Sequence, residues 1–279
     1  MNIQIDSARC VQCGRCVAVC PVSIFQGRRG EVPQVDHPEG CIACGHCVAV
    51  CRGDSIRHEA FPPATVRPVR RDLLPTPESL MELIRSRRSN RTLLPQPIPP
   101  EALADILEAA RYAPTAENTR RVRVTVIDDA AHIQRVEDGT MRFFLRLARV
   151  LLHPLVRPLT RRLLPDLYRE SPELVRFERR WRQGERPCTC NAPVLLAFST
   201  PAGYDFGPED SNLAYQNASL MAEAHGLSQI YMGLVQTACK LIGTSRTRRL
   251  LGLPPGHRLQ ALMALGVPKL RFERYAKRG

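Results

Sequence analysis

The spacing of apolar residues after residue 76 changes between the helical and the extended period. Thr76 precedes Pro77, and Leu80, Leu83 and Ile84 then recur at helical spacing, which predicts a capped helix. Valines at every second position over 122–126 predict a strand. The other predicted elements are helices over 100–111 and 211–225 and short buried strands over 194–198 and 260–266. Interleaved helices and strands indicate a mixed domain.

Prolines take the place of this periodicity in the stretch before Thr76. They occur at Pro62, Pro63, Pro68 and Pro75, a density that predicts a stiff, extended connector rather than a helix or a strand. A chain of 279 residues suits one small and one medium domain. We therefore expect an N-terminal domain over 1–61, a linker over 62–77 and a larger domain over 78–279.

The net charge of +13 is distributed unevenly. Residues 1–60 hold six arginines and six acidic residues, so the excess lies beyond them. No nucleic-acid motif accompanies this charge and aromatic residues make up 5% of the chain, so we expect no nucleic-acid partner. No apolar stretch approaches the roughly 18 residues that a membrane span needs, and we expect a cytoplasmic protein.

Eight cysteines near the N-terminus carry the clearest chemistry. They form two copies of the pattern C-x2-C-x2-C-x3-C, namely Cys10, Cys13, Cys16, Cys20 and Cys41, Cys44, Cys47, Cys51. Structural zinc takes four ligands, usually in two separated pairs, and disulfides would imply an exported chain. Residues 1–6 lack the basic and apolar regions of a signal peptide. We therefore predict iron–sulfur clusters, and a reducing compartment to keep them.

The two runs resemble those of bacterial-type ferredoxins, which hold a pair of [4Fe–4S] clusters. In these proteins the last cysteine of each run binds the other cluster. The resemblance implies one cluster on Cys10, Cys13, Cys16 and Cys51, and the other on Cys41, Cys44, Cys47 and Cys20. One departure is Arg52, which follows the second run where Pro21 follows the first.

The first predicted helix ends in three arginines and a serine, which suit a phosphate site because guanidinium groups and hydroxyls donate to phosphate oxygens. Further segments follow in a characteristic order. They are Arg87-Arg88-Ser89-Asn90-Arg91, Pro114-Thr115-Ala116-Glu117-Asn118, Leu251-Gly252-Leu253-Pro254 and Gly266-Val267-Pro268-Lys269-Leu270-Arg271. As a set they resemble the nitroreductase family of FMN enzymes across about residues 78–275, and the whole chain resembles ferredoxin–nitroreductase fusions.

That resemblance implies an α+β fold and a homodimer with FMN at the subunit interface. The FMN phosphate and ribityl chain would be held by Arg87, Arg88, Ser89, Arg91, Lys269 and Arg271. The flavin ring would be contacted from the partner subunit by Pro114, Thr115, Ala116 and Asn118, and near its N5 atom by Met232, Gly233 and Leu234. No catalytic side chain is predicted, since the reaction takes place at flavin N5. Arg120-Arg121-Val122 departs from the family's usual Gln-Pro-Trp.

An insertion over 141–187 mixes apolar residues with arginines, and Pro154, Pro158 and Pro165 predict that it is broken into short helices. In this family such insertions cover the flavin, so we expect a lid. Contact of 141–182 with an anionic membrane surface, and packing in the dimer, are the alternatives. Cys188, Cys190 and Cys239 are expected to be buried thiols, although Cys188 and Cys190 also fit a redox pair.

The expected function is an oxidoreductase that passes electrons from a low-potential external donor, such as a ferredoxin, through two [4Fe–4S] clusters to FMN. A small conjugated acceptor, such as a nitroaromatic, a quinone or an enone, would then be reduced. The alternatives are an electron carrier or redox sensor without enzymatic activity, and an enzyme that oxidises NAD(P)H and passes electrons outward. The sequence contains no convincing G-x-G-x-x-G motif, but this family needs none.

Overall fold

A computed structural model describes residues 1–163, 165 and 176–278. The chain divides into two compact units. The first contains Met1–Pro75 together with Ala116–Thr119, and the second contains Thr76–Thr115 and Arg120–Gly279. Within the described residues, no helix is long and apolar enough to cross a membrane.

The first unit is built from two interlocked halves related by a shift of 31 positions, as from Cys10 to Cys41. Its elements are β1 (Ile3–Ile5), α1 (Arg15–Val19), β2 (Phe25–Gln26), β3 (Gln34–Val35), α2 (His46–Val50) and β4 (Ile56–His58). β1 pairs with β4 and β2 pairs with β3, both antiparallel. Each small sheet therefore takes one strand from each half.

Glycines set the turn into each short helix of this unit. Gly14 and Gly45 precede α1 and α2 with φ of 69° and 77°, the left-handed region that favours glycine. The core between the halves is small and buries Ile3, Ile24 and Ile56. Cysteines of both runs pack against it, so the thiols lie between the halves.

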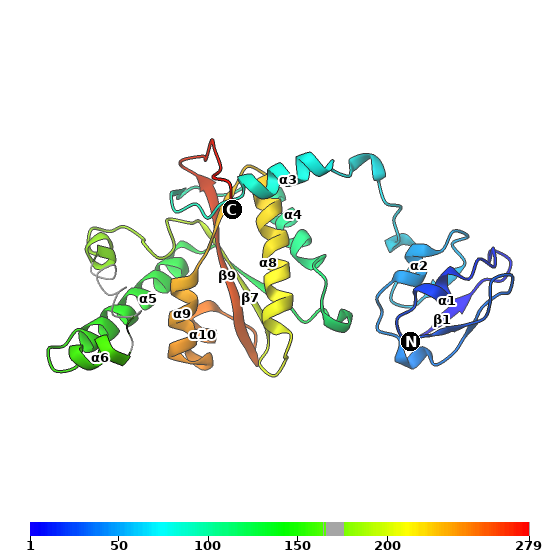
Figure 1. Ribbon diagram of the computed structural model, residues 1–279, viewed down its shortest axis with the longest axis horizontal. Helices are drawn as coiled ribbons and strands as arrows, with labels where there is room; N and C mark the ends of the chain where they lie inside the picture. The colour runs from blue at the N-terminus through cyan, green and yellow to red at the C-terminus, as the bar shows by residue number, and fades with distance from the viewer. Residues whose placement is uncertain (164, 166–175, 279) are drawn as a thin grey trace. The chain divides into compact units, whose positions relative to one another are not determined.

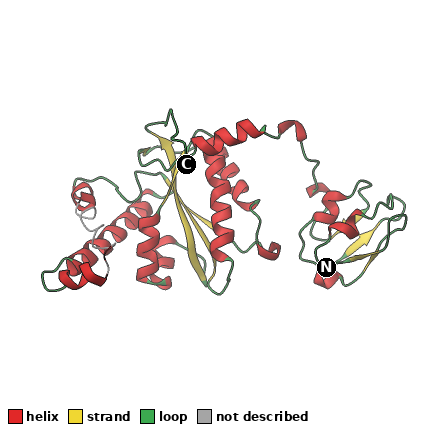
Figure 2. Cartoon of the chain, in the orientation of Figure 1, coloured by secondary structure: helices red, strands yellow, loops and turns green. Residues whose placement is uncertain are grey.

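The second unit is organised around an antiparallel sheet, seen at the centre of its cartoon in Figure 2. Its strands are β5 (Leu93–Leu94), β6 (Arg123–Ile127), β7 (Val194–Pro201), β8 (Ser228–Tyr231) and β9 (His257–Pro268). β9 pairs along one edge with β7, which pairs in turn with β6. Along its other edge β9 pairs with both β8 and β5.

Helices cover both faces of this sheet (Figure 1). Alternate residues of β7 separate accordingly: Leu196 and Phe198 join one core, and Leu195 and Ala197 join the other. The first face is covered by α4 (Pro100–Arg111) and α8 (Gly207–Ala224), and the second by α5 (Ala130–Leu151), α9 (Gly233–Ile242) and α10 (Thr244–Leu251). Burial on both faces explains why the first five residues of β7, 194–198, are a continuous apolar run.

The predicted elements of this unit are confirmed with shifted ends. Thr76 caps α3 (Pro77–Ser86) by accepting a hydrogen bond from the Ser79 amide. The helix predicted over 211–225 is α8, which begins one turn earlier, and the strand predicted over 260–266 is the longer β9.

The predicted linker contains two 3-10 turns, η2 (Pro63–Thr65) and η3 (Arg71–Leu73), because a proline such as Pro63 is compatible with the first turn of a helix. The prediction for the insertion is wrong. The insertion does not begin as a short helix. α5 is one helix of 22 residues that starts at the cap Asp129 and ends before Pro154, and α6 (Arg157–Leu163) follows. Residues 164 and 166–175 of the insertion lie outside the described part of the chain.

Candidate functional site

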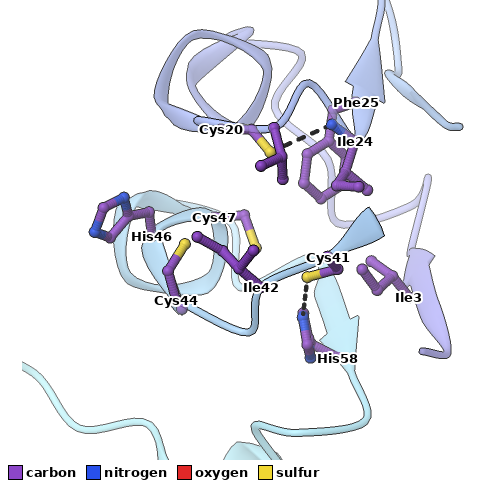
Figure 3. A pocket seen from close by; sticks show the side chains of 12 residues that line it. Ile3, Cys20, Ile24, Phe25, Cys41, Ile42, Cys44, His46, Cys47 and His58 are labelled. Carbon is purple, nitrogen blue, oxygen red and sulfur yellow. Dashed lines mark hydrogen bonds between the residues drawn. The ribbon is translucent and has the colours of Figure 1, made fainter. Parts of the chain in front are cut away.

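Cysteines from both runs surround a cavity in the first unit. Its lining includes Cys41, Cys44 and Cys47 from the second run and Cys20 from the first. Figure 3 shows these side chains around the cavity. Within the described residues no three His, Cys, Asp or Glu side chains are grouped tightly enough for one metal ion. Thiols spread around a cavity are the donor set that a cubane cluster requires.

The remaining cysteines form a second neighbourhood. Cys51 and Cys10 lie close enough to Cys16 for their charges to act on its pKa. Three of the four thiols predicted for the first cluster are therefore neighbours, and again one comes from the other run. The last cysteine of each run lies with the other run because of the strand pairing. Cys20 leads into β2 and Cys51 leads into β4, and each of these strands pairs with a strand of the other half.

Burial controls the acidity of several of these thiols. It raises the pKa of Cys47 to about 11, with neighbouring cysteine charges acting in the same direction. Burial also opposes ionisation of Cys51, but hydrogen bonds from the side chain and backbone of Ser55 outweigh it and lower the Cys51 pKa. Binding to iron would replace the proton on each thiol.

Backbone and side-chain donors are directed at the sulfur atoms. The amides of Ile24 and Ser55 lie 3.3 Å from Cys20 Sγ and Cys51 Sγ, respectively. Ser55 Oγ lies 3.2 Å from the same Cys51 sulfur, and His58 Nε2 lies 3.4 Å from Cys41 Sγ. Ser55 and His58 were not predicted, because they occur after the cysteine runs in no recognisable motif.

In the second unit, the arginine-rich segment is positioned by a residue that the resemblance did not assign. Asn90 is 1% exposed, and its amide donates to the Leu270 carbonyl at 2.7 Å. Its carbonyl oxygen accepts from the Thr92 amide at 2.9 Å and the Thr92 hydroxyl at 2.8 Å. The backbone amide of Asn90 donates to the Gln229 carbonyl of β8. Asn90 thus connects three segments that are distant in sequence.

These contacts bring the two predicted phosphate-binding segments together. Lys269 donates its backbone amide to Thr92 at 2.7 Å, just beyond the pairing of β5 with the end of β9. Arg87, Arg88 and Ser89 are half-buried, whereas Arg91, Lys269 and Arg271 are exposed. The Asn90 and backbone contacts thus place two segments that carry cationic residues next to each other, and guanidinium, ammonium and hydroxyl groups are a donor set that fits the phosphate of FMN.

Met232, Gly233 and Leu234 lie at the start of α9. Met232 is buried and donates its amide to the Leu262 carbonyl of β9. Gly233 is the first residue of α9, where backbone amides have no partner within the helix. A Cβ on Gly233 would meet no atom within 4 Å, so there is open space beside the Cα of this residue. An amide donor at such a place suits the N5 atom of a flavin.

The insertion reaches this same helix start. Phe143, Phe144 and Leu147 of α5 pack in one apolar cluster with Leu234 and Ala238 of α9. Farther along, most side chains of α6 face outward, although Thr160 is buried. Leu159 and Leu163 are 57% and 64% exposed, and the arginines of α6 are exposed beside them.

The segment Pro114–Asn118 is divided between the units. Pro114 and Thr115 belong to the second unit, where Thr115 Oγ1 accepts a hydrogen bond from the Arg120 amide. Ala116 and Asn118 belong to the first, where the Asn118 side chain donates to the carbonyls of Ile42 and Ala43 at 3.0 and 2.7 Å. Asn118 and the arginine-rich segment therefore belong to different units.

The three remaining cysteines are buried, as predicted. Cys188 and Cys190 flank Thr189 next to Glu137, whose carboxylate is fully buried. That carboxylate accepts from the Cys188 amide at 3.0 Å, the Thr189 amide at 2.7 Å and the Thr189 hydroxyl at 2.8 Å. Burial, with the Glu137 charge, raises the pKa values of Cys188 and Cys190.

Comparison with known families gives two matches. A model described as the nitroreductase family matches residues 84–267, and a model of a 4Fe-4S dicluster domain matches residues 2–52. Among solved structures, a nitroreductase with bound FMN from Bacteroides fragilis superposes with a TM-score of 0.54 and 22% identity. The superposition covers 72% of this chain and 95% of that one.

Two curated relatives also match. A nitrobenzene nitroreductase from Ectopseudomonas oleovorans is 45% identical over 58 residues, which are 21% of this chain. That match spans 26% of the relative's own length. An NADH dehydrogenase from Thermus thermophilus is 30% identical over 187 residues, covering 65% of this chain and 83% of the relative.

Proposed function

The chain belongs to the nitroreductase family and carries a 4Fe-4S domain at its N-terminal end. From this premise we propose the route that electrons take through this FMN-dependent oxidoreductase. In our proposal, electrons from a low-potential donor such as a ferredoxin enter through two [4Fe–4S] clusters and leave through FMN to a small conjugated acceptor. One observation carries the proposal. Within a chain of this family, Cys41, Cys44 and Cys47 share a cavity with Cys20.

We assign the residues that hold each group as follows. Cys41, Cys44, Cys47 and Cys20 bind one cluster, and Cys10, Cys13, Cys16 and Cys51 bind the other. The FMN phosphate lies between the arginine-rich segment 87–91 and the segment of Lys269 and Arg271. When bound, clusters supply one-electron chemistry and the flavin couples it to two-electron chemistry. FMN lies at the interface of a homodimer.

The chain's own groups position these cofactors. Asn90 holds the two cationic segments next to each other through its bonds to Leu270 and Thr92. The amides at the start of α9 offer donors that favour the reduced flavin. α5 forms the base of a lid, because Phe143 and Phe144 pack against Leu234. The lid excludes water while an acceptor is bound.

An anaerobic experiment tests the proposal. Iron, sulfide, zinc and flavin are measured per chain, and FMN bleaching is then followed with reduced ferredoxin and, separately, with NADH and NADPH. We expect iron and sulfide for two clusters, one flavin per chain, and rapid bleaching by ferredoxin. Replacing Cys44 by Ala should abolish bleaching by ferredoxin while flavin stays bound. Zinc in place of iron, or absence of flavin, would contradict the proposal.

A second function is favoured by one comparison. The relative with the longer match is an NADH dehydrogenase, which supports entry of electrons from NAD(P)H and their exit through the clusters. Bleaching by NADH or NADPH but not by ferredoxin would identify this direction. For the acceptor, the nitrobenzene nitroreductase supports a nitroaromatic compound, which should be compared with a quinone and an enone in turnover.

A further inference from the structure

His58 is a buried histidine whose hydrogen bonds define the state of its ring. It is 5% exposed at the end of β4, and its ring packs against Phe61 at 4.9 Å between centroids. The Ala60 amide donates to His58 Nδ1 at 3.1 Å. Because Nδ1 is the acceptor, the proton of the neutral ring is on Nε2. Nε2 lies 3.4 Å from Cys41 Sγ, so this N–H is directed at the sulfur (Figure 3).

A donor at a cluster ligand affects the two oxidation states differently. Reduction adds negative charge that is shared with the thiolate sulfurs, and an N–H directed at one of them stabilises that charge. Hydrogen bonds to the sulfurs are among the factors that set the reduction potentials of iron–sulfur clusters. The His58 donor should therefore raise the potential of the cluster to which Cys41 belongs.

The internal duplication provides a comparison within the molecule. The backbone donors to Cys20 and Cys51 are equivalent, since Ile24 and Ser55 occupy matching positions 31 residues apart at the same 3.3 Å. Their side chains differ, because Ser55 adds a hydroxyl 3.2 Å from Cys51 Sγ and Ile24 has none to offer. In the same way, the position that matches His58 is Gly27, which has no side chain to donate.

We propose that His58 and Ser55 are positioning residues that set the potentials of the two clusters separately, one acting through Cys41 and the other through Cys51. The proposal rests on the crossed ligand sets of the proposed function. Cys41 shares its cluster with Cys20, and Cys51 shares its cluster with Cys10. Two side-chain donors in one half of the sequence thus act on two different clusters.

The experiment is a redox titration of the full-length protein, followed by electron paramagnetic resonance under anaerobic conditions. His58→Asn keeps an acceptor for the Ala60 amide but no longer reaches Cys41, whereas His58→Gln restores an N–H at the distance of Nε2. Ser55→Ala removes the hydroxyl and keeps the backbone donor. His37→Asn is the control, because His37 is exposed at 62% of its side chain and its φ of 42° suits asparagine.

We expect His58→Asn to shift one of the two cluster transitions to lower potential, and His58→Gln to return it toward the wild-type value. Ser55→Ala should shift the other transition, and His37→Asn should shift neither transition.

Unchanged potentials in a His58→Asn protein with full iron would overturn the inference. A shift of the same transition by His58→Asn and by Ser55→Ala would also overturn it. Absence of two cluster signals in the wild-type protein would instead contradict the proposed function. Iron content is measured for every variant. If His58→Asn does not incorporate iron, the cluster potentials of His58→Gln and Ser55→Ala are compared instead.

Discussion

Glu137 shows how a single buried carboxylate organises the start of the insertion and the entry to β7. It lies on α5, and its three hydrogen bonds reach the turn at Cys188 and Thr189. A buried carboxylate is stable only if its oxygens are paired, and here two amides and a hydroxyl pair them. This contact fixes α5 to the segment that leads into the central sheet.

Replacing Glu137 by Ala should lower the free energy of unfolding by about 3 kcal/mol, because it leaves buried donors without an acceptor. Denaturant unfolding of the flavin-loaded protein measures the change. Glu108→Ala, on the exposed side of α4, is the matched control and should change it by less than about 0.5 kcal/mol. A loss for Glu137→Ala no greater than that of the control would contradict this role.

The buried thiols permit a prediction with a pH dependence. Burial raises the pKa of Cys239 to about 11, so the thiol is protonated below that pH and becomes a reactive thiolate only above it. At pH 8 its thiolate fraction is on the order of 0.001, against roughly a quarter for an unperturbed cysteine. We expect alkylation of Cys239 at least about 100-fold slower than in the unfolded chain, as followed by mass spectrometry of peptides. Equal rates at pH 8 would contradict the burial of this side chain.

Among the elements, the edge of β9 formed with β5 and β8 holds the cationic segments. Gly266 in β9 is tightly packed, because a Cβ there would lie 3.5 Å from Leu93 Cβ of β5 and 2.8 Å from Pro193 Cδ, just before β7. Asn90 completes the edge with hydrogen bonds to Leu270 and Thr92 on either side. The proposed flavin phosphate site would thus be formed by strand pairing rather than by a local loop.

Asn90→Ala should weaken FMN binding by roughly tenfold or more, because it removes about 1.4 kcal/mol or more of the bonding that holds the two segments together. Titration of the flavin-free protein with FMN, followed by quenching of flavin fluorescence, measures the dissociation constant. Asn2→Ala, an exposed substitution in the other unit, is the control. An unchanged dissociation constant for Asn90→Ala would show that the cationic segments are held by other contacts.

At the scale of the whole molecule, the two units have separate hydrophobic cores. The first unit buries only a few apolar side chains, including Ile3, Ile24 and Ile56, whereas the second has a core on each face of its sheet. A small unit with so little apolar burial depends on its metal for stability. The second unit buries enough apolar surface to be stable without iron.

Removal of iron by a chelator under oxidising conditions should therefore unfold the first unit and leave the second folded. Calorimetry should show that one unfolding transition is lost while the transition of the flavin-binding unit moves by no more than a few degrees. Bound flavin, measured in the same sample, should be retained. Loss of both transitions together would show that the units depend on each other for stability.

The sequence predicted those features that are local or that repeat. The spacing of eight cysteines indicated the cluster domain, and periodicity gave α3, α4 and the central strands to within a few residues. The predicted length of α5 was wrong, because Pro154 indicates only where a helix must end and not where it begins. The segments that resemble the nitroreductase family also predicted flavin-binding residues, and these assignments stay predictions.

Three contacts required the tertiary structure. Asn90 reaches Leu270 across 180 positions, Glu137 reaches Thr189 across 52, and His58 reaches Cys41 across 17. No motif assigned these roles to Asn90, Glu137 or His58, because each side chain acts by making a polar contact between segments that meet only after folding. The sequence by itself determined which chemistry the chain is built for, since ligand type and spacing are local properties. Only the tertiary structure decided which side chains support that chemistry, since burial and hydrogen-bond pairing depend on what the fold brings together.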